Sequence, residues 1–178
     1  MKIFIQVLGI IAATVAIIAF QARKKKNILI LKGIDSVLFA VQWGLLHEWT
    51  AMTLTIVSIA RNLFMAFYVN EKNRCIILIA IFSIINIGLG ILTYQNWPSI
   101  LKIIATVITT ISFGVADVKL VRLLTIPACI LAVVHASLPI NFSIGGIITE
   151  SFTIISILIA MIRFRKVSKE KLPNTQMN

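Results

Sequence analysis

The sequence has few charged residues, and few of its charges are negative. Only 13% of its 178 residues are charged, whereas a soluble domain carries about a quarter. Such a chain cannot cover a water-soluble surface, and with 59% hydrophobic residues it belongs in a lipid bilayer. The formal net charge is +11. The cations lie in short segments between apolar runs, a pattern of membrane orientation, so we expect no nucleic-acid partner.

Patterns of catalysis and metal binding are also absent from the sequence. Two His and two Cys show no spacing typical of a metal site. No Ser, His and Asp set indicates a nucleophile, and no glycine-rich loop follows a predicted strand. We therefore expect no enzyme, no metal and no cofactor. Cys75 and Cys129 are expected to be ordinary residues in apolar surroundings.

Long apolar runs are what the sequence does contain, and each is close to the roughly 20 residues that a membrane-spanning helix needs. The predicted helices cover residues 3–20, 28–46, 49–69, 75–93, 99–116, 119–138 and 142–164. The fold class is therefore all-α, a polytopic membrane helix bundle. We expect one transmembrane domain, residues 1–164, and a basic cytoplasmic tail, residues 165–178.

Basic residues fall mainly on one side of this arrangement. A cluster of four follows the first run: Arg23, Lys24, Lys25 and Lys26. The later segments of the same side hold Lys72, Arg74, Lys119, Arg122, Arg163, Arg165, Lys166, Lys169 and Lys171. The other side holds only Lys2 and Lys102. The positive-inside rule then predicts an outer N-terminus and a cytoplasmic C-terminus in a bacterial inner membrane, with anionic lipid at the basic side.

Aromatic residues give independent support for this orientation. The breaks assigned to the outer face contain Trp43, Trp49, Tyr94, Trp97 and Phe142. Trp and Tyr prefer the headgroup level of a membrane. The next turn residues, His47 and Glu48, are expected to be solvated.

The layout of the chain repeats when residues 10–68 are laid over 103–161. Each half has an apolar run, a basic inner loop, a second run, a short outer turn and a third run. The repeats cover residues 1–70 and 99–164, and a linker helix, 75–93, lies between them. This 3+1+3 plan with parallel repeats is a known transporter architecture, in which the binding site lies near the membrane midplane.

Several motifs resemble the YgjV family of bacterial inner-membrane proteins. They are Phe20-Gln21 before the basic run, Gln42 with Leu45-Leu46 in the second run, and Arg61 in the third. The sequence departs from the family pattern at residues 47–52, "HEWTAM". More distantly, the plan is similar to that of the PQ-loop group, which includes SWEET sugar transporters. Phe20-Gln21 and Phe113-Gly114 stand where that group has Pro-Gln pairs, so the resemblance implies a fold and no sugar specificity.

Charged residues in the middle of a predicted membrane helix are costly, and they usually face the bundle interior. Arg61 and Glu150 are two such residues, and we expect them to face a shared central cavity. They line a substrate path or form a buried ion pair that fixes helix register. Helical spacing supports the facing, because a polar stripe includes Ser143, Gly146, Glu150 and Thr153. A looser stripe on the third run includes Thr50, Thr53, Ser58 and Arg61.

Four further polar residues complete the candidate cavity and substrate path. Asp35 lies one turn from Lys32, and either pairs with it or couples protons. Gln42 and His135 occupy equivalent positions of the two repeats near the outer ends of their helices, where a gate or an ordinary hydrogen bond is possible. Asn62 is a candidate for hydrogen bonding between helices.

Two functions remain open at this point. The first is a small transporter that moves a polar solute through a cavity between the two halves. The second is a membrane scaffold, sensor or assembly subunit without transport. A water-accessible polar path to Arg61 or Glu150 favours the first, and a dry ion pair favours the second.

Overall fold

The computed structural model describes residues 2–68, 72–139 and 142–170, and the described residues form seven α-helices. The helices are α1 (Lys2–Gln21), α2 (Lys25–Leu45), α3 (Trp49–Phe67), α4 (Lys72–Leu92), α5 (Pro98–Gly114), α6 (Val118–Ser137) and α7 (Ile144–Glu170). The all-helical prediction is confirmed, and each predicted run contains one helix.

Three helix ends differ from the sequence prediction by three residues or more. Helix α2 begins at Lys25, inside the basic cluster, α4 begins at Lys72, and α7 continues to Glu170. The first six residues of the predicted tail are therefore helical. Charged residues there continue the helix because no Gly or Pro interrupts the chain between 164 and 170. The rest of the predicted tail, 171–178, lies outside the described residues.

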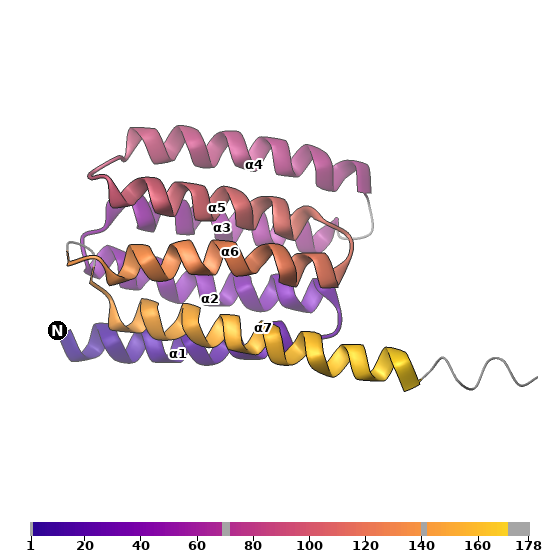
Figure 1. Cartoon of the computed structure of the whole chain (residues 1–178). Coiled ribbons are helices and arrows are strands. Elements are labelled where there is room, and N and C mark those ends of the chain that lie inside the picture. The colour runs from indigo at the N-terminus through magenta and orange to yellow at the C-terminus, as the bar shows by residue number, and fades with distance from the viewer. Residues whose placement is uncertain (1, 69–71, 140–141, 171–178) are drawn as a thin grey trace, which may run out of the picture.

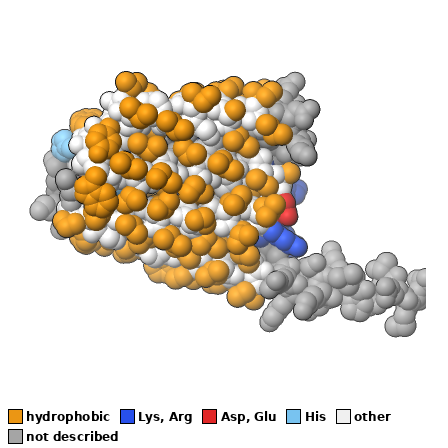
Figure 2. All heavy atoms as spheres, turned by 45° about the horizontal axis from the view of Figure 1, so that its top comes forward, with side chains coloured by type: hydrophobic (Ala, Val, Ile, Leu, Met, Phe, Trp, Pro, Cys, Tyr) orange, Lys and Arg blue, Asp and Glu red, His pale blue; other side chains and the backbone are white. Residues whose placement is uncertain are grey.

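Four of the described helices are long and apolar enough to cross a membrane. They are Lys25–Leu45, Trp49–Phe67, Val118–Ser137 and Ile144–Arg163. Shorter apolar helical stretches occupy Val7–Gln21, Ile76–Leu92 and Pro98–Gly114. Isoleucine, leucine, valine and phenylalanine side chains cover the visible outer face of the bundle (Figure 2). An outer face covered with apolar side chains is favourable in contact with lipid and unfavourable in contact with water.

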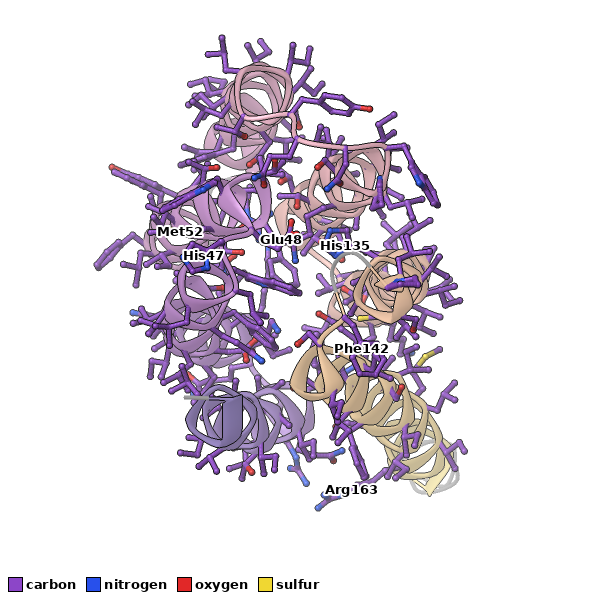
Figure 3. The ribbon with its side chains drawn as sticks, turned by 90° about the vertical axis from the view of Figure 1, so that its left-hand side faces the viewer. His47, Glu48, Met52, His135, Phe142 and Arg163 are labelled. Carbon is purple, nitrogen blue, oxygen red and sulfur yellow. The ribbon has the colours of Figure 1, made fainter. Side chains whose placement is uncertain are left out.

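Six of the helices form a ring. Each helix packs against its neighbours in sequence, α7 closes the ring on α1, and α3 also contacts α5. Helix α4 lies outside, over the seam between α3 and α5 (Figures 1 and 3). Two glycines let it pack there, because a Cβ at Gly90 or Gly114 would collide with the side chain of Ile103 or Ile79.

The two ends of the bundle differ in composition. One end carries the α1–α2 and α5–α6 connections and the C-terminal part of α7, and exposed cations lie there: Arg23, Lys24, Lys26, Lys119 and Arg163. We call it the basic end. The opposite, aromatic end carries the α2–α3 and α4–α5 turns, with Trp49, Tyr94 and Trp97 about half exposed. Figure 1 shows that the N-terminus lies at the aromatic end and that α7 runs out at the basic end.

Apolar clusters fill the ring near both ends. The basic-end cluster contains Phe20, Ile28, Leu29, Met65, Ala66, Phe113, Val121 and Ile157. The aromatic-end cluster contains Ala12, Phe39, Trp43, Ala51 and Ala136. Both clusters consist of buried side chains from several helices, so they stabilise the ring at its two ends. The buried polar residues of the ring lie between the two clusters.

The turn between α2 and α3 depends on one residue in the left-handed region, His47, with φ of 59°. The amide of Glu48 donates to the carbonyl of Trp43 (3.0 Å), and the amide of His47 donates to that of Gly44 (3.1 Å). This pair of bonds is a Schellman motif, whose left-handed position is usually glycine. Histidine there carries a steric cost that glycine does not.

We expect His47→Gly to stabilise the protein by about 0.5–1 kcal/mol, because relief of left-handed strain outweighs the added freedom of the unfolded chain. Val115→Gly is the matched control, since Val115 also follows a helix but has φ of −68°. Glycine relieves no strain at Val115, so that variant should lose stability. Denaturant titration in detergent micelles measures both, and a loss of stability in His47→Gly would contradict the argument.

Candidate site: a polar cavity inside the helix ring

A cavity of about 90 Å³ lies inside the ring, between the two apolar clusters. Six helices contribute to its wall, and α4 contributes none of the lining residues. The charged residues of the wall are Lys32, Asp35, Arg61, Lys102 and Glu150. Five threonines also line it: Thr55, Thr106, Thr109, Thr125 and Thr153. So many polar groups inside a membrane bundle mark a functional site by default.

Lys32 and Asp35 form an ion pair one turn apart on α2. The pairing considered from their spacing is therefore present. It differs from a surface pair, because Asp35 is only 1% exposed and both residues line the cavity. Each charge of this pair is largely neutralised by the other.

Arg61 is held by neutral partners. Its guanidinium donates to Asn62 Oδ1 from Nε (3.2 Å) and Nη2 (3.0 Å), and from Nη1 to Thr110 Oγ1 (2.8 Å) and the Thr106 carbonyl (3.3 Å). These contacts join α3 to α5. Asn86 of α4 donates to the same Thr110 hydroxyl (3.3 Å). Among the residues that the structure describes, the only salt bridge is Lys32–Asp35, so Arg61 is a buried cation without a carboxylate.

Glu150 has different charged neighbours. Its carboxylate lies close enough to Lys32 of α2 and Lys102 of α5 to interact electrostatically with both, and it also interacts with the Cys129 thiol of α6. Glu150 and Arg61 thus face the same cavity, but they do not form the ion pair that the sequence suggested as one arrangement. Of the stripe on α7, Gly146, Glu150 and Thr153 line the cavity.

Each cation of the cavity lies over an aromatic ring. Lys32 Nζ is 5.9 Å from the centre of the Phe20 ring, Arg61 Cζ is 5.3 Å from that of Phe113, and Lys102 Nζ is 5.3 Å from that of Trp43. A desolvated cation gains about 2 kcal/mol from such a ring face. The aromatic residues of the two clusters therefore help to hold positive charge at the cavity.

Three buried polar atoms of the wall have no hydrogen-bond partner among the described residues. They are Trp43 Nε1, Asp35 Oδ1 and Thr153 Oγ1, and their residues are between 1% and 3% exposed. Helical threonines usually donate to the carbonyl four residues earlier, as Thr55 and Thr125 do here. A buried polar atom left without a partner is unfavourable by about 1–3 kcal/mol, so these three atoms are candidates for contact with a polar guest.

The remaining predicted site residues lie nearby. Asn62 lines the cavity and donates weakly to Ser36 Oγ (3.5 Å). Gln42 and His135 are both fully buried toward the aromatic end, but they are not among the lining residues. Gln42 donates to Ser143 Oγ (3.2 Å), where α1 and α7 cross closely at Gly9 and Gly145.

His135 points into the ring at the aromatic end, as does Glu48 (Figure 3). The edge of its ring meets Trp43, with centroids 5.6 Å apart. Trp43 also stacks on Phe39 and has the Lys102 ammonium over its face. Trp43 was predicted to be a membrane-interface residue, and this is wrong, because only 3% of it is exposed.

Two other assignments are corrected by the structure. Lys102 was assigned to the outer side, yet it lines the cavity because it lies one turn inside α5 and shares a face with Ala105, Thr106 and Thr109. That i, i+3, i+4, i+7 spacing could have revealed it. Glu48 was expected to be solvated, but it is 7% exposed, and burial raises the pKa of its carboxyl.

The basic cluster after α1 behaves in two ways. Arg23, Lys24 and Lys26 are exposed at the basic end, as topology anchors require, whereas Lys25 is 6% exposed. Arg122 also lies inward, and its Nη2 donates to the carbonyls of Phe20 (3.2 Å) and Ala22 (3.0 Å), where α1 ends. These bonds satisfy helix-end carbonyls that have no partner within the helix.

Comparison with known proteins agrees with this picture. No curated protein and no solved structure matches the chain. A family model described as a bacterial inner membrane protein, Imp-YgjV, matches residues 3–168 and so covers nearly the whole chain. The chain therefore belongs to the YgjV family of bacterial inner-membrane proteins, and it is a multi-pass protein of that membrane.

Proposed function

We propose that the chain is a carrier, and not an enzyme, that moves a small polar solute across the inner membrane. The observation behind this proposal is a charged cavity in the centre of a helix ring, flanked by an apolar cluster at each end. Such a wall is unfavourable in a purely structural bundle, because burying charge inside a membrane costs about 3 kcal/mol per residue. A solute-binding site gives those residues a role.

We further propose that the ring consists of two parallel three-helix repeats, with α4 as the linker. The packing pairs support this, because exchanging α1, α2, α3 with α5, α6, α7 turns each observed pair of the ring into another observed pair. Thus α1 with α7 becomes α5 with α3. A two-fold axis along the membrane normal, through the cavity, would produce this pattern.

The lining residues give a second, independent support for the repeats. Five positions of α2 line the cavity: Lys32, Asp35, Ser36, Phe39 and Trp43. Five positions of α6 line it as well, each displaced by 93 residues: Thr125, Ala128, Cys129, Ala132 and Ala136. Phe20 and Phe113 have the same displacement and meet in one cluster. Equivalent positions of the two halves thus face the cavity but carry different side chains. Those of α2 are mostly large or charged, and those of α6 are small and mostly apolar.

The same proposal includes an orientation. The basic end is cytoplasmic, so the N-terminus is outside and the C-terminus inside. Exposed cations at one end and half-exposed Trp and Tyr side chains at the other support it. Figure 2 shows Lys and Arg colours at one end of the apolar face and His at the other. Anionic lipid headgroups would contact Arg23, Lys24 and Lys26 at the cytoplasmic surface.

The test of carrier activity is counterflow into vesicles. Purified protein is reconstituted into liposomes preloaded with pools of small carboxylates, amino acids, polyols or sugars, and entry of a labelled member of each pool is followed. We expect one pool to drive accumulation above that of empty liposomes, and Glu150→Gln to reduce it at least tenfold. Folded protein that exchanges no pool would leave the scaffold alternative as the better explanation.

A further inference from the structure

The cavity wall carries more positive than negative charge. Lys32, Arg61 and Lys102 are cations, whereas Asp35 and Glu150 are the only carboxylates among the lining residues. Lys32 and Asp35 neutralise each other. Glu150 remains to balance two cations, one of which, Arg61, has only neutral partners. The formal excess is one positive charge, which a bound monoanion would neutralise.

Lys102 is the group best placed to bind that anion. Its ammonium has three N–H donors and lies over the Trp43 ring, within electrostatic reach of Glu150, yet it donates no hydrogen bond to any described residue. Its side chain is partly exposed at the cavity. An ammonium at a cavity wall is stabilised by hydrogen-bond acceptors, and a guest in the cavity would supply them to Lys102.

Three orphaned atoms define the rest of the guest. Trp43 Nε1 and Thr153 Oγ1 each carry a hydrogen that nothing accepts, and Asp35 Oδ1 is an acceptor to which nothing donates. A guest that satisfies all three has acceptor atoms and a separate O–H or N–H donor. An inorganic halide provides no donor, and a simple sugar provides no charge.

The volume limits the size of the guest. Water takes about 30 Å³ in the liquid, and a cavity of about 150 Å³ holds benzene. By the same scale, about 90 Å³ holds roughly three or four non-hydrogen atoms. The guest is therefore no larger than about a two-carbon carboxylate, and a hydroxyl or amino group on it would fill the cavity.

We propose that the cavity binds a small monocarboxylate with a hydrogen-bond donor, of the hydroxy-acid type, with its carboxylate at Lys102. This inference rests on the proposed carrier function, and it specifies the solute class. Arg61, which is bonded to Thr106 and Thr110 of the helix that carries Lys102, contributes its field, and Thr153 and Asp35 bond the carboxylate and the donor group. The other half of the ring contributes the small side chains of α6 that leave room for the guest.

Calorimetric titration of the purified protein in chloride-free detergent buffer tests the solute class on the wild-type chain. The probes are glycolate, acetate, acetamide, ethylammonium and chloride. We expect glycolate to bind most tightly and acetate several-fold more weakly, with no heat from acetamide or ethylammonium. Binding of acetamide as tight as that of acetate, or equal affinity for chloride and glycolate, would overturn the assignment.

Variants locate the site. Lys102→Met keeps the apolar stem and should weaken glycolate binding at least tenfold, as loss of a charge-assisted hydrogen bond implies. Lys119→Met is the matched control, because Lys119 is exposed at the basic end, and its affinity should equal that of the wild type. Thr153→Val serves if Lys102→Met fails to fold, and should weaken binding several-fold. Wild-type affinity in folded Lys102→Met or Thr153→Val would refute this site.

The binding and vesicle experiments separate the two proposals. Carboxylate binding without exchange of any pool would support the proposed anion site and contradict the proposed carrier function. Exchange of a sugar or amine pool by protein that binds no carboxylate would support the carrier function and contradict the proposed anion site. Exchange of the carboxylate pool together with glycolate binding supports both.

Discussion

Phe20→Ala should expose the Cys129 thiol to a charged, membrane-impermeant maleimide at least tenfold faster than in the wild-type protein. Phe20 is fully buried in the basic-end cluster and lines the cavity, and Cys129 lines the same cavity at 4% exposure. Truncating a buried phenylalanine opens space and costs about 3–5 kcal/mol where the surroundings do not collapse. Water and reagent would then reach the cavity from the basic end.

The labelling experiment is performed in a Cys75→Ser background, in right-side-out and inverted vesicles. Phe67→Ala is the control, because it removes the same atoms from a side chain that is 75% exposed on the outer face of α3. This substitution leaves the basic-end cluster unchanged. Acceleration confined to inverted vesicles also agrees with a cytoplasmic basic end. Equal acceleration in Phe67→Ala, or none in Phe20→Ala, would show that the cluster does not limit access.

Arg61→Leu should reduce solute exchange by at least about 100-fold, the scale of one buried charge-assisted interaction, and yet change the free energy of unfolding by only about 1 kcal/mol. One gain opposes two losses, because the variant also loses the contact of Arg61 with the Phe113 ring, which is worth about 2 kcal/mol. Removing an arginine from the middle of a membrane helix gains about 3 kcal/mol on insertion scales. Asn62 Oδ1 then loses the two N–H groups that it accepts, which costs about 1–3 kcal/mol.

Asn62→Leu is the matched variant for this argument. This variant removes the acceptor of the Arg61 hydrogen bonds and leaves the buried cation in place. The lost hydrogen bonds and the less stabilised cation both destabilise the fold, so we expect the free energy of unfolding to fall by about 2–3 kcal/mol. A swap of Arg61→Glu with Glu150→Arg should restore nothing, because Arg61 has neutral partners and Glu150 has Lys32 and Lys102 as neighbours. A loss above 3 kcal/mol in Arg61→Leu, or rescue by the swap, would make Arg61 a structural residue and favour the scaffold alternative.

The helices were predictable from the sequence because apolar run length has a direct physical meaning in a membrane. Seven runs gave seven helices, and Pro98, Asp117 and the basic segments lie at or next to the ends where they were expected. The stripe on α7 also predicted an inward Glu150, because helical spacing alone determines which residues share a face. Arg61 followed from the cost of a charge at that depth.

Partner choice could not be predicted in the same way. Arg61 and Glu150 have opposite charges and face one cavity, but which groups meet depends on how far α3 and α7 are rotated and on what α5 inserts between them. Lys102 and Trp43 were misplaced for a related reason. Both lie near a helix end, where sequence position indicates the membrane surface. The spacing of Lys102 with Ala105, Thr106 and Thr109 indicates its inward face, whereas for Trp43 only the packing of α2 against its neighbours shows it.

Helix α4 has a consequence for how this protein can be encoded. It touches the ring through α3 and α5 and supplies no residue to the cavity wall. In the two-repeat arrangement proposed above, its main role is to give the second triplet the same direction of insertion as the first, beside the bond from Asn86 to Thr110. If that proposal holds, two shorter genes, each translated into three membrane-spanning helices of the same orientation, would build the same cavity by pairing side by side in the bilayer.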